Sequence, residues 1–163
     1  MTAPEIKKVQ DYVDGFGLGL KVLEMKENTA TSELAAAALG VLVGQIAKSI
    51  LFMADGEPVL VVASGDVKIK SNRLKRLTGA SKIKMADYET VKKITGYDVG
   101  GVCPLALPQK VKIFLDDSMK RFPVVYAAAG TASSALPVNM DQLRLLTGGE
   151  WADLTDVNSN GSE

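Results

Sequence analysis

Residues 46–63 read IAKSILFMADGEPVLVVA, and this stretch decides the fold. It holds two apolar runs, Ile46–Met53 and Pro58–Ala63, on either side of Ala54-Asp55-Gly56-Glu57. An Asp-Gly pair between two such runs is a strong short-range signal for a β-hairpin, because both residues accept the positive φ angles of a tight turn. The sequence therefore predicts an antiparallel pair of strands here.

Helix and strand signals surround this hairpin. Thr31 offers an N-cap hydroxyl to an alanine-rich run, and Gly40 stands where a C-cap glycine ends a helix. Periodicity predicts further helices over residues 4–14, 71–77, 88–94 and 143–146, and strands over residues 18–23, 82–85, 111–115 and 124–128. Because the elements alternate irregularly, we expect an α/β (α+β) fold, with a mixed, largely antiparallel β-sheet and packed helices in a single compact domain.

The chain has 163 residues, enough for one domain with a single core. We place this domain at residues 1–155 and expect a flexible tail at residues 156–163, where the row is too polar to bury. No apolar stretch reaches the ~18 residues that span a bilayer. The first residues do not follow the pattern of a signal peptide. We therefore expect a cytoplasmic protein with no membrane partner.

The amino-acid counts exclude several kinds of chemistry. The sequence has no histidine and one cysteine, Cys103. Catalytic triads with histidine, Cys-His dyads, histidine metal ligands and cysteine zinc clusters are therefore all excluded, and we expect neither a metal nor another cofactor. Cys103 has no cation or base near it in the sequence, so we interpret it as a residue that lines a pocket or packs in the core, and not as a nucleophile.

Lys48 interrupts the first apolar run of the hairpin. Strand alternation would place its ammonium on the same face as Ile46 and Ile50, and Ser49 on the opposite face. One interpretation is an edge position whose stem lies along apolar surface while the charge reaches water. The other interpretation is a cation in a cleft.

Two glycine-containing segments are further candidates for a site. In Thr95–Pro104, adjacent glycines at 100 and 101 allow a ligand to approach the backbone, and Pro104 stiffens the exit. Such a loop can present N–H groups to an oxyanion, although a helix-ending turn explains the same composition. Ala127–Ala132, which includes Gly130, can line a site of close approach or pack tightly.

Five segments together resemble, in order and spacing, the YbaK-like aminoacyl-tRNA deacylase family, which includes editing domains associated with prolyl-tRNA synthetase. The resemblance covers residues 29–153 and rests most on Ile-Ala-Lys-Ser and on the Gly-x-x-x-Pro loop. The segments are Thr31–Gly40, Gly44–Phe52, Asp55–Val62, Thr95–Pro104, and Leu145–Gly148 followed by Trp151–Asp153. The resemblance implies a metal-independent hydrolase that acts in trans on the ester between a small amino acid and its tRNA.

The resemblance also implies roles for individual residues. Lys48 matches the functionally critical lysine of the family, so it is the expected catalytic residue. Gly100, Gly101 and Pro104 match the loop that shapes the aminoacyl pocket, and Gly130 matches a glycine-containing motif and is a candidate substrate-binding residue. Some members carry a histidine in that motif, which this chain lacks.

The implied partners are a mischarged tRNA and, in addition, an aminoacyl-tRNA synthetase. The formal net charge is zero, so any tRNA contact must come from local charge. The basic segment between Lys68 and Lys93 is the candidate contact, although lysines on solvated helices are common. The residues we single out in it are Arg73, Lys75, Arg76, Lys82 and Lys84.

Two other functions stay open at this point. The chain could be a non-catalytic module of the same fold that binds aminoacyl-tRNA or a synthetase. It could also bind a small molecule unrelated to tRNA. The sequence does not name the amino acid that would be removed.

Overall fold

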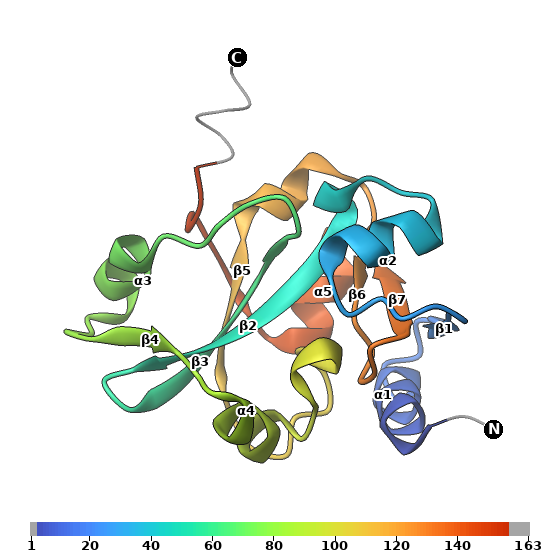
Figure 1. Cartoon of the computed structure of the whole chain (residues 1–163), viewed down its shortest axis with the longest axis horizontal. Helices are drawn as coiled ribbons and strands as arrows, with labels where there is room; N and C mark the ends of the chain where they lie inside the picture. Colours follow the sequence, from blue (N-terminus) through green and yellow to red (C-terminus); the bar gives the residue numbers. More distant parts are fainter. Residues whose placement is uncertain (1–2, 157–163) are drawn as a thin grey trace.

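The computed structural model describes residues 3–156 and places a mixed sheet at the centre of the molecule (Figure 1). The eight strands are β1 (Leu23–Glu24), β2 (Ile46–Ala54), β3 (Glu57–Ser64), β4 (Ile83–Met85), β5 (Lys112–Asp116), β6 (Val125–Ala127), β7 (Ser134–Val138) and β8 (Glu150–Ala152). The helices are α1 (Pro4–Asp14), α2 (Ser32–Leu39), α3 (Ser71–Thr78), α4 (Tyr88–Thr95) and α5 (Met140–Thr147). Three short 3₁₀ helices complete the fold: η1 (Val43–Gln45), η2 (Val99–Gly101) and η3 (Asp117–Arg121).

The predicted hairpin is confirmed as β2 and β3. They pair antiparallel from Ala47 opposite Ser64 to Ala54 opposite Glu57. The turn residues Asp55 and Gly56 have φ angles of 48° and 85°, as a tight hairpin turn requires. This hairpin supplies the two central strands of the sheet.

The sheet order is β1-β7-β6-β2-β3-β5-β8, and β4 pairs with β2 beside this path. The pairs β1–β7, β2–β3, β2–β4 and β6–β7 are antiparallel, whereas β2–β6, β3–β5 and β5–β8 are parallel. The expectation of a mixed, largely antiparallel sheet in one compact domain is therefore confirmed. The strand predicted over residues 18–23 is wrong in extent, because only Leu23 and Glu24 find a partner, in β7.

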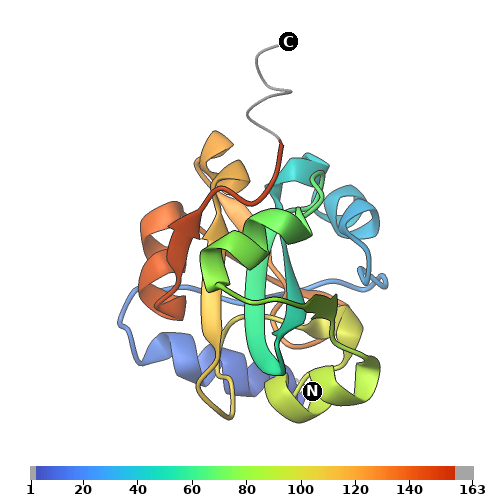
Figure 2. The ribbon, with the colours of Figure 1, turned by 90° about the vertical axis from the view of Figure 1, so that its left-hand side faces the viewer.

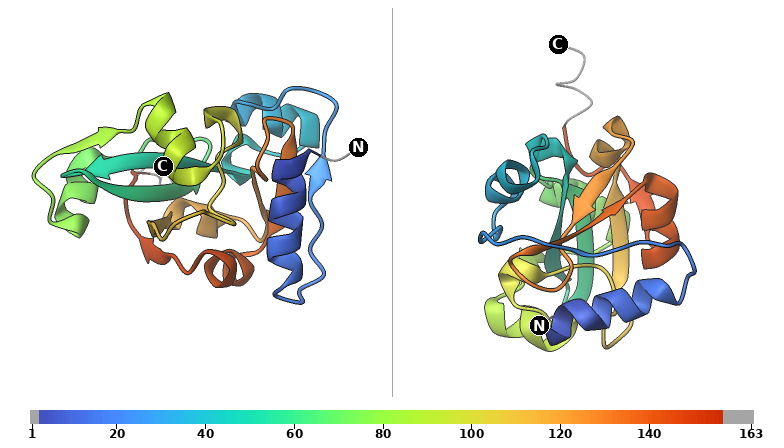
Figure 3. Two further views of the ribbon diagram at one scale, coloured as in Figure 1. Left: turned by 90° about the horizontal axis from the view of Figure 1, so that it is seen from below. Right: turned by 90° about the vertical axis from the view of Figure 1, so that its right-hand side faces the viewer.

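Alternation along the hairpin divides the core between the two faces of the sheet. Leu51 and Leu60 belong to the larger cluster, to which α1, α4 and α5 contribute, and Phe52 and Val61 belong to a second cluster under α3. A third, small cluster joins α2 to Ile46. Helices therefore pack against the sheet over both faces (Figure 3).

The two ends of the molecule carry different elements. Figures 1 and 3 show α3 and β4 at one end and α1 and α2 at the other. In Figure 2, which looks onto the first end, α3 lies in front of the β2–β3 hairpin. Since β2 begins near α2 and ends near β4, it connects the two ends.

Of the tail predicted at residues 156–163, only Asp156 lies within the described residues. Its carboxylate pairs with Lys70 at 3.0 Å and with Arg73 at 2.6 Å. Residues 157–163 lie outside the described part of the chain. Among residues 3–156, no helix is both long and apolar enough to cross a bilayer.

Candidate functional site

One edge of β2 is interrupted in its middle. On this edge β6 pairs with Ile46 and Ala47, and β4 pairs with Phe52–Ala54. Residues 48–51 lie between the two ladders, and among the contacts of the described residues this stretch of the edge shows one backbone bond, from the Ala86 amide to the Leu51 carbonyl at 2.9 Å. Successive residues of a strand turn their backbone groups to alternate edges, so the N–H and C=O of Ser49 face this gap.

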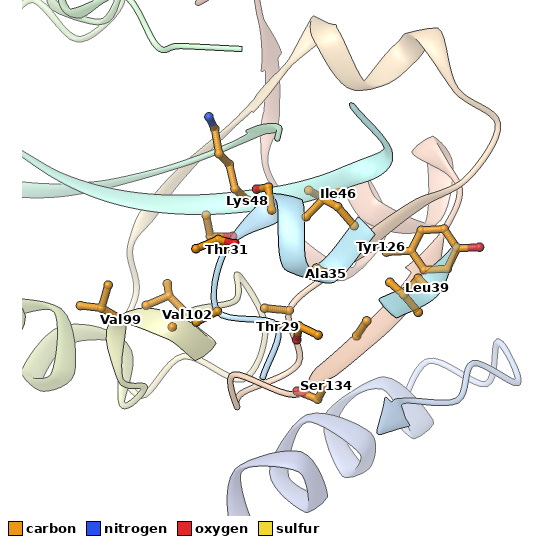
Figure 4. A pocket seen from close by; sticks show the side chains of 17 residues that line it. Thr29, Thr31, Ala35, Leu39, Ile46, Lys48, Val99, Val102, Tyr126 and Ser134 are labelled. Atoms are coloured by element: carbon orange, nitrogen blue, oxygen red, sulfur yellow. The ribbon is translucent and has the colours of Figure 1, made fainter. Parts of the chain in front are cut away.

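A cavity of about 110 Å³ opens beside the gap (Figure 4). Its walls come from α2 and the segment before it, the start of β2, the η2 loop, the end of β6 and the start of β7. Because a water molecule needs about 10–15 Å³ of such space, the cavity holds on the order of eight water-sized groups. The lining residues are Thr29–Ser32, Ala35, Leu39, Ile46–Ser49, Val99, Gly100, Val102, Tyr126, Ala128, Ser134 and Ala135.

Lys48 and Ser49 both line this cavity. Alternation places them on opposite faces of β2, as the sequence predicts, but the cavity wraps around the open strand edge and reaches both. The Ser49 hydroxyl is buried and has no hydrogen-bond partner among the described residues. Among the described lining residues, Lys48 carries the only charge.

The Lys48 ammonium is held by a backbone carbonyl. Its Nζ donates a hydrogen bond to the Val67 oxygen, and in Figure 4 the side chain extends away from Thr29 and Ser134. Burial lowers the pKa of Lys48 from the ordinary value of 10.5, and Lys68 lowers it further, while the charges of Asp66 and Glu33 oppose this shift. The side chain is therefore a partly buried cation at the rim of the cavity.

The predicted glycines occupy different positions around the cavity. Gly100 lines it, and a Cβ there would lie 3.3 Å from the Cβ atoms of Ala30 and Ala132. Gly101 is buried behind it, where a Cβ would lie 2.7 Å from the Gly130 oxygen. Gly130 has a φ of 103°. The η2 loop and the loop after β6 therefore touch through backbone atoms.

Pro104 and Cys103 are buried beyond the lining of the cavity. The Cys103 thiol lies 3.7 Å from the Leu105 oxygen, and burial raises its pKa to about 11. A thiol in these surroundings is neutral near pH 7 and inaccessible, which agrees with a packing role.

Most of the hydroxyls that line the cavity were not singled out by the sequence analysis. Thr29 donates to the Ala132 oxygen at 2.7 Å, Thr31 caps α2 by accepting from the Leu34 amide, and Ser134 bonds to Thr131. The cap was predicted at Thr31, but its place at a cavity depends on segments that are far apart in the sequence. Among the described residues these three hydroxyls all have hydrogen-bond partners, whereas that of Ser49 has none.

The predicted basic residues separate into two groups at the α3 end of the molecule. Lys75, Lys82 and Lys84 line one shallow depression beside the hairpin turn, which we call the three-lysine depression. Arg73 and Arg76 line a different one, next to Trp151. Met53 lines the three-lysine depression. It lies five residues after Lys48 on β2, which corresponds to about 17 Å at about 3.3 Å per residue.

The described residues 3–156 contain no cluster of three or more His, Cys, Asp or Glu side chains placed to hold a metal ion. The chemistry available at the cavity is therefore that of one ammonium group, hydroxyls and backbone amides.

Comparison with known proteins places the chain among its relatives. Residues 26–146 match the family model of the aminoacyl-tRNA editing domain. The uncharacterised protein YwhH of Bacillus subtilis (strain 168) is 37% identical over 139 residues, which is 85% of this chain and 88% of YwhH. Proline–tRNA ligase of Geobacter sp. (strain M21) is 35% identical over 101 residues, but these cover 62% of this chain and only 18% of the ligase.

Solved structures agree with the sequence comparison. A protein described as a proposed trans-editing enzyme for prolyl-tRNA synthetase superposes with a TM-score of 0.89 and 33% identity, covering 95% of this chain and 99% of that one. The hypothetical protein APE2540 gives a TM-score of 0.84 and 32% identity, covering 91% and 99%. The chain belongs to the aminoacyl-tRNA editing domain family.

Proposed function

We propose that this protein is a trans-acting editing hydrolase, which removes a small amino acid from mischarged tRNA by hydrolysing the aminoacyl ester. The observation that carries the proposal is the cavity of about 110 Å³ with the Lys48 cation at its rim. A space on the order of eight water-sized groups fits the aminoacyl part of a small amino acid. The tRNA must then extend outward from the cavity.

Hydrolysis of an activated ester requires a placed water and stabilisation of the oxyanion more than it requires a strong base. In the proposed reaction, water adds to the ester carbonyl, the C–O bond to the terminal ribose breaks, and free amino acid and tRNA leave. Lys48 supplies positive charge to the ester oxygen or to the terminal phosphate, a role that suits a compact ammonium. Gly100 lines the cavity, and we assign its backbone to orienting the aminoacyl group.

The three-lysine depression is the proposed contact for the tRNA backbone, and it lies about 17 Å along β2 from Lys48. The salt dependence of binding is the slope of log K against the logarithm of the salt concentration. Each lost phosphate contact should reduce the size of this slope by somewhat less than about one unit. A variant with Lys75, Lys82 and Lys84 all changed to Gln should therefore bind tRNA more weakly, and the slope of log K against log salt should be smaller by about two to three units. An unchanged slope would place the tRNA elsewhere.

Energetics explain why a cell needs such an enzyme. A synthetase pocket discriminates by only about 1–3 kcal/mol per methylene, so amino acids that are smaller than or similar in size to the cognate one are mischarged. A synthetase is the proposed second partner, on the strength of the prolyl-tRNA synthetase relationship of the similar proteins.

One observation favours the non-catalytic alternative, in which the chain only binds aminoacyl-tRNA. The Lys48 ammonium is already bound by the Val67 carbonyl and extends away from part of the cavity wall. A binding module would use Lys48 for affinity, and a hydrolase would use it for turnover.

The test is deacylation of alanyl-, cysteinyl-, seryl- and threonyl-tRNA by wild type and by Lys48→Ala. Lys110→Ala is the matched control, because Lys110 is exposed and lines neither the cavity nor the three-lysine depression. We expect wild type and Lys110→Ala to hydrolyse one of the four, and Lys48→Ala to be at least about 100-fold slower. Binding without hydrolysis by wild type would establish the module instead.

A further inference from the structure

The turn that follows β3 lies directly against Lys48. It consists of Gly65, Asp66 and Val67. The Gly65 amide donates to the Ile46 oxygen at 2.7 Å, so the turn closes over the start of β2. Its last residue provides the carbonyl that accepts the Lys48 hydrogen bond.

Arg121, at the end of η3, binds this turn through the Asp66 carboxylate. Its Nη1 and Nη2 lie 3.1 Å and 2.6 Å from the two carboxylate oxygens of Asp66. Its Nε donates to the Ser118 oxygen at 2.8 Å, which fixes the orientation of the guanidinium. Two parallel bonds to one carboxylate restrict direction as well as distance, which a single lysine contact would not do.

Close packing from two glycines leaves the turn little freedom. A Cβ at Gly44 would lie 2.9 Å from the Asp66 Oδ2 and 2.8 Å from the Phe122 ring. A Cβ at Gly65 would lie 2.6 Å from the Ser32 Cβ. Hence η1, η3 and the start of α2 all touch the turn. The contacts with η1 and α2 require glycine at positions 44 and 65, and the contact with η3 is the bidentate bond from Arg121.

Stability alone does not account for the Asp66–Arg121 pair. The side chains are 38% and 31% exposed, and pairs this open to solvent contribute little to the free energy of folding. Neither residue lines the cavity. The pair does join η3 to the turn that carries the Val67 carbonyl.

The charges around Lys48 come from two segments. Asp66 and Lys68 lie on the chain after β3, and Glu33 lies in the first turn of α2. Asp66 is the leading charge that raises the pKa of Lys48 against the effect of burial. Arg121 acts on this group of charges through Asp66, to which it is bound.

We propose that Asp66 and Arg121 are positioning residues for Lys48: the pair locks the turn after β3, so that the Val67 carbonyl holds the ammonium at the rim of the cavity. The catalytic consequence rests on the proposed function, since it is turnover that needs the ammonium in one place. The placement of the ammonium itself can be measured without any activity.

Three variants separate positioning from simple charge. Asp66→Asn removes the charge and the bidentate bond. Arg121→Lys keeps the positive charge but loses the fork. Glu33→Gln is the matched control, because Glu33 raises the pKa of Lys48 through its charge and makes no hydrogen bond or ion pair to the turn among the described contacts. Thermal melts establish that each variant is folded.

Positioning predicts that Asp66→Asn and Arg121→Lys lower kcat at least about tenfold at a pH where Lys48 is fully protonated, with KM changed less than about threefold. In Glu33→Gln, kcat at that pH should stay at the wild-type value, and only the alkaline limb of the pH profile should move to lower pH. If Asp66→Asn behaves as Glu33→Gln does, Asp66 is only a charge and the proposal is overturned.

A titration of the Lys48 side chain by NMR distinguishes this proposal from the proposed function. The pKa of Lys48 should fall in Asp66→Asn, and the Nζ resonance should lose its hydrogen-bonded character in both Asp66→Asn and Arg121→Lys. If wild type hydrolyses none of the four aminoacyl-tRNAs but these changes in the Lys48 resonances occur, the positioning role is supported and the proposed editing activity is contradicted. If the Lys48 resonances are unchanged in both variants, the positioning falls whatever the activity is.

Discussion

Arg73 holds Asp156 through its Nη2, which lies 2.6 Å from the Asp156 Oδ1. The same guanidinium donates to Asp153 at 3.1 Å and to the Thr155 carbonyl. This one side chain therefore fastens α3 to the segment that follows β8. Lys75, two residues further along α3, is exposed and faces the three-lysine depression instead.

Arg73→Ala should therefore affect folding more than tRNA binding. We expect the melting temperature to fall by about 2–4 °C, because surface ion pairs and a side chain–carbonyl bond are lost. Lys75→Ala should leave the melting temperature unchanged and weaken tRNA binding. Calorimetry and a filter-binding titration at one salt concentration would compare the two variants. The reverse pattern would mean that Arg73 releases its acidic partners to contact tRNA.

The pH dependence of deacylation should report on Lys48. Burial lowers its pKa below 10.5, and the ammonium is the form that supplies charge. The rate should be fully present below the folded-state pKa and should fall as pH rises through it. In the unfolded chain the lysine keeps its proton to higher pH, so stability should rise with pH between the two values.

The measurement is the rate above the uncatalysed background from about pH 6 to about pH 10. Lys48→Arg is the control, because a guanidinium stays charged over this range. If Lys48→Arg is active and shows the same alkaline fall as wild type, another group controls the profile.

Gly100 and Gly101 should respond differently to alanine. A new Cβ at position 101 would meet backbone atoms of Gly130 and Thr131 at 2.7 Å, so the two loops must separate. We expect Gly101→Ala to lose about 1–3 kcal/mol of unfolding free energy. Gly100→Ala meets only alanine side chains at 3.3 Å, and should keep most of its stability while narrowing the cavity and slowing deacylation. Urea denaturation and steady-state kinetics would check both, and equal stability losses would contradict the proposed packing.

Ser49→Ala should not cost stability. The hydroxyl is buried without a partner, so its removal relieves a desolvation cost, and the free energy of unfolding should stay level or rise by about 1 kcal/mol. Ser134→Ala is the matched case, because its Oγ bonds to the amide and the hydroxyl of Thr131 at 3.2 Å and 3.0 Å. Ser134→Ala should lower the free energy of unfolding by about 1–2 kcal/mol. A clear loss in Ser49→Ala would reveal a partner for the hydroxyl in solution.

Local signals in the sequence predicted the elements that depend on neighbouring residues. Thr31 caps α2, Gly40 ends it at a φ of 70°, and the Asp55-Gly56 turn joins β2 to β3. The long-range pairings could not be predicted in this way. Strand β7 was missed because Pro137 interrupts its pattern. The strand predicted over residues 18–23 has an alternating pattern, but of these residues only Leu23 pairs with a neighbouring strand, β7.

The candidate site was predictable only in part, for a similar reason. Lys48 stands out because a charge interrupts an apolar strand. Ser49 does not stand out, because alternation assigns it to the opposite face and gives no hint that the β2 edge opens between β6 and β4. A cavity assembled from five separate segments exists only once the sheet order is known.

Because the edge of β2 is open beside the cavity, amide exchange in this strand should report whether the cavity holds a ligand. The Ser49 amide faces the gap, whereas the Ile50 amide faces β3 within a continuous ladder. In hydrogen–deuterium exchange, the Ser49 amide should therefore lose its proton faster than its neighbour, although both lie in the middle of a central strand. A bound aminoacyl group that fills the gap would slow the exchange of the Ser49 amide and leave that of the Ile50 amide unchanged, so this pair of amides would report whether the cavity is filled.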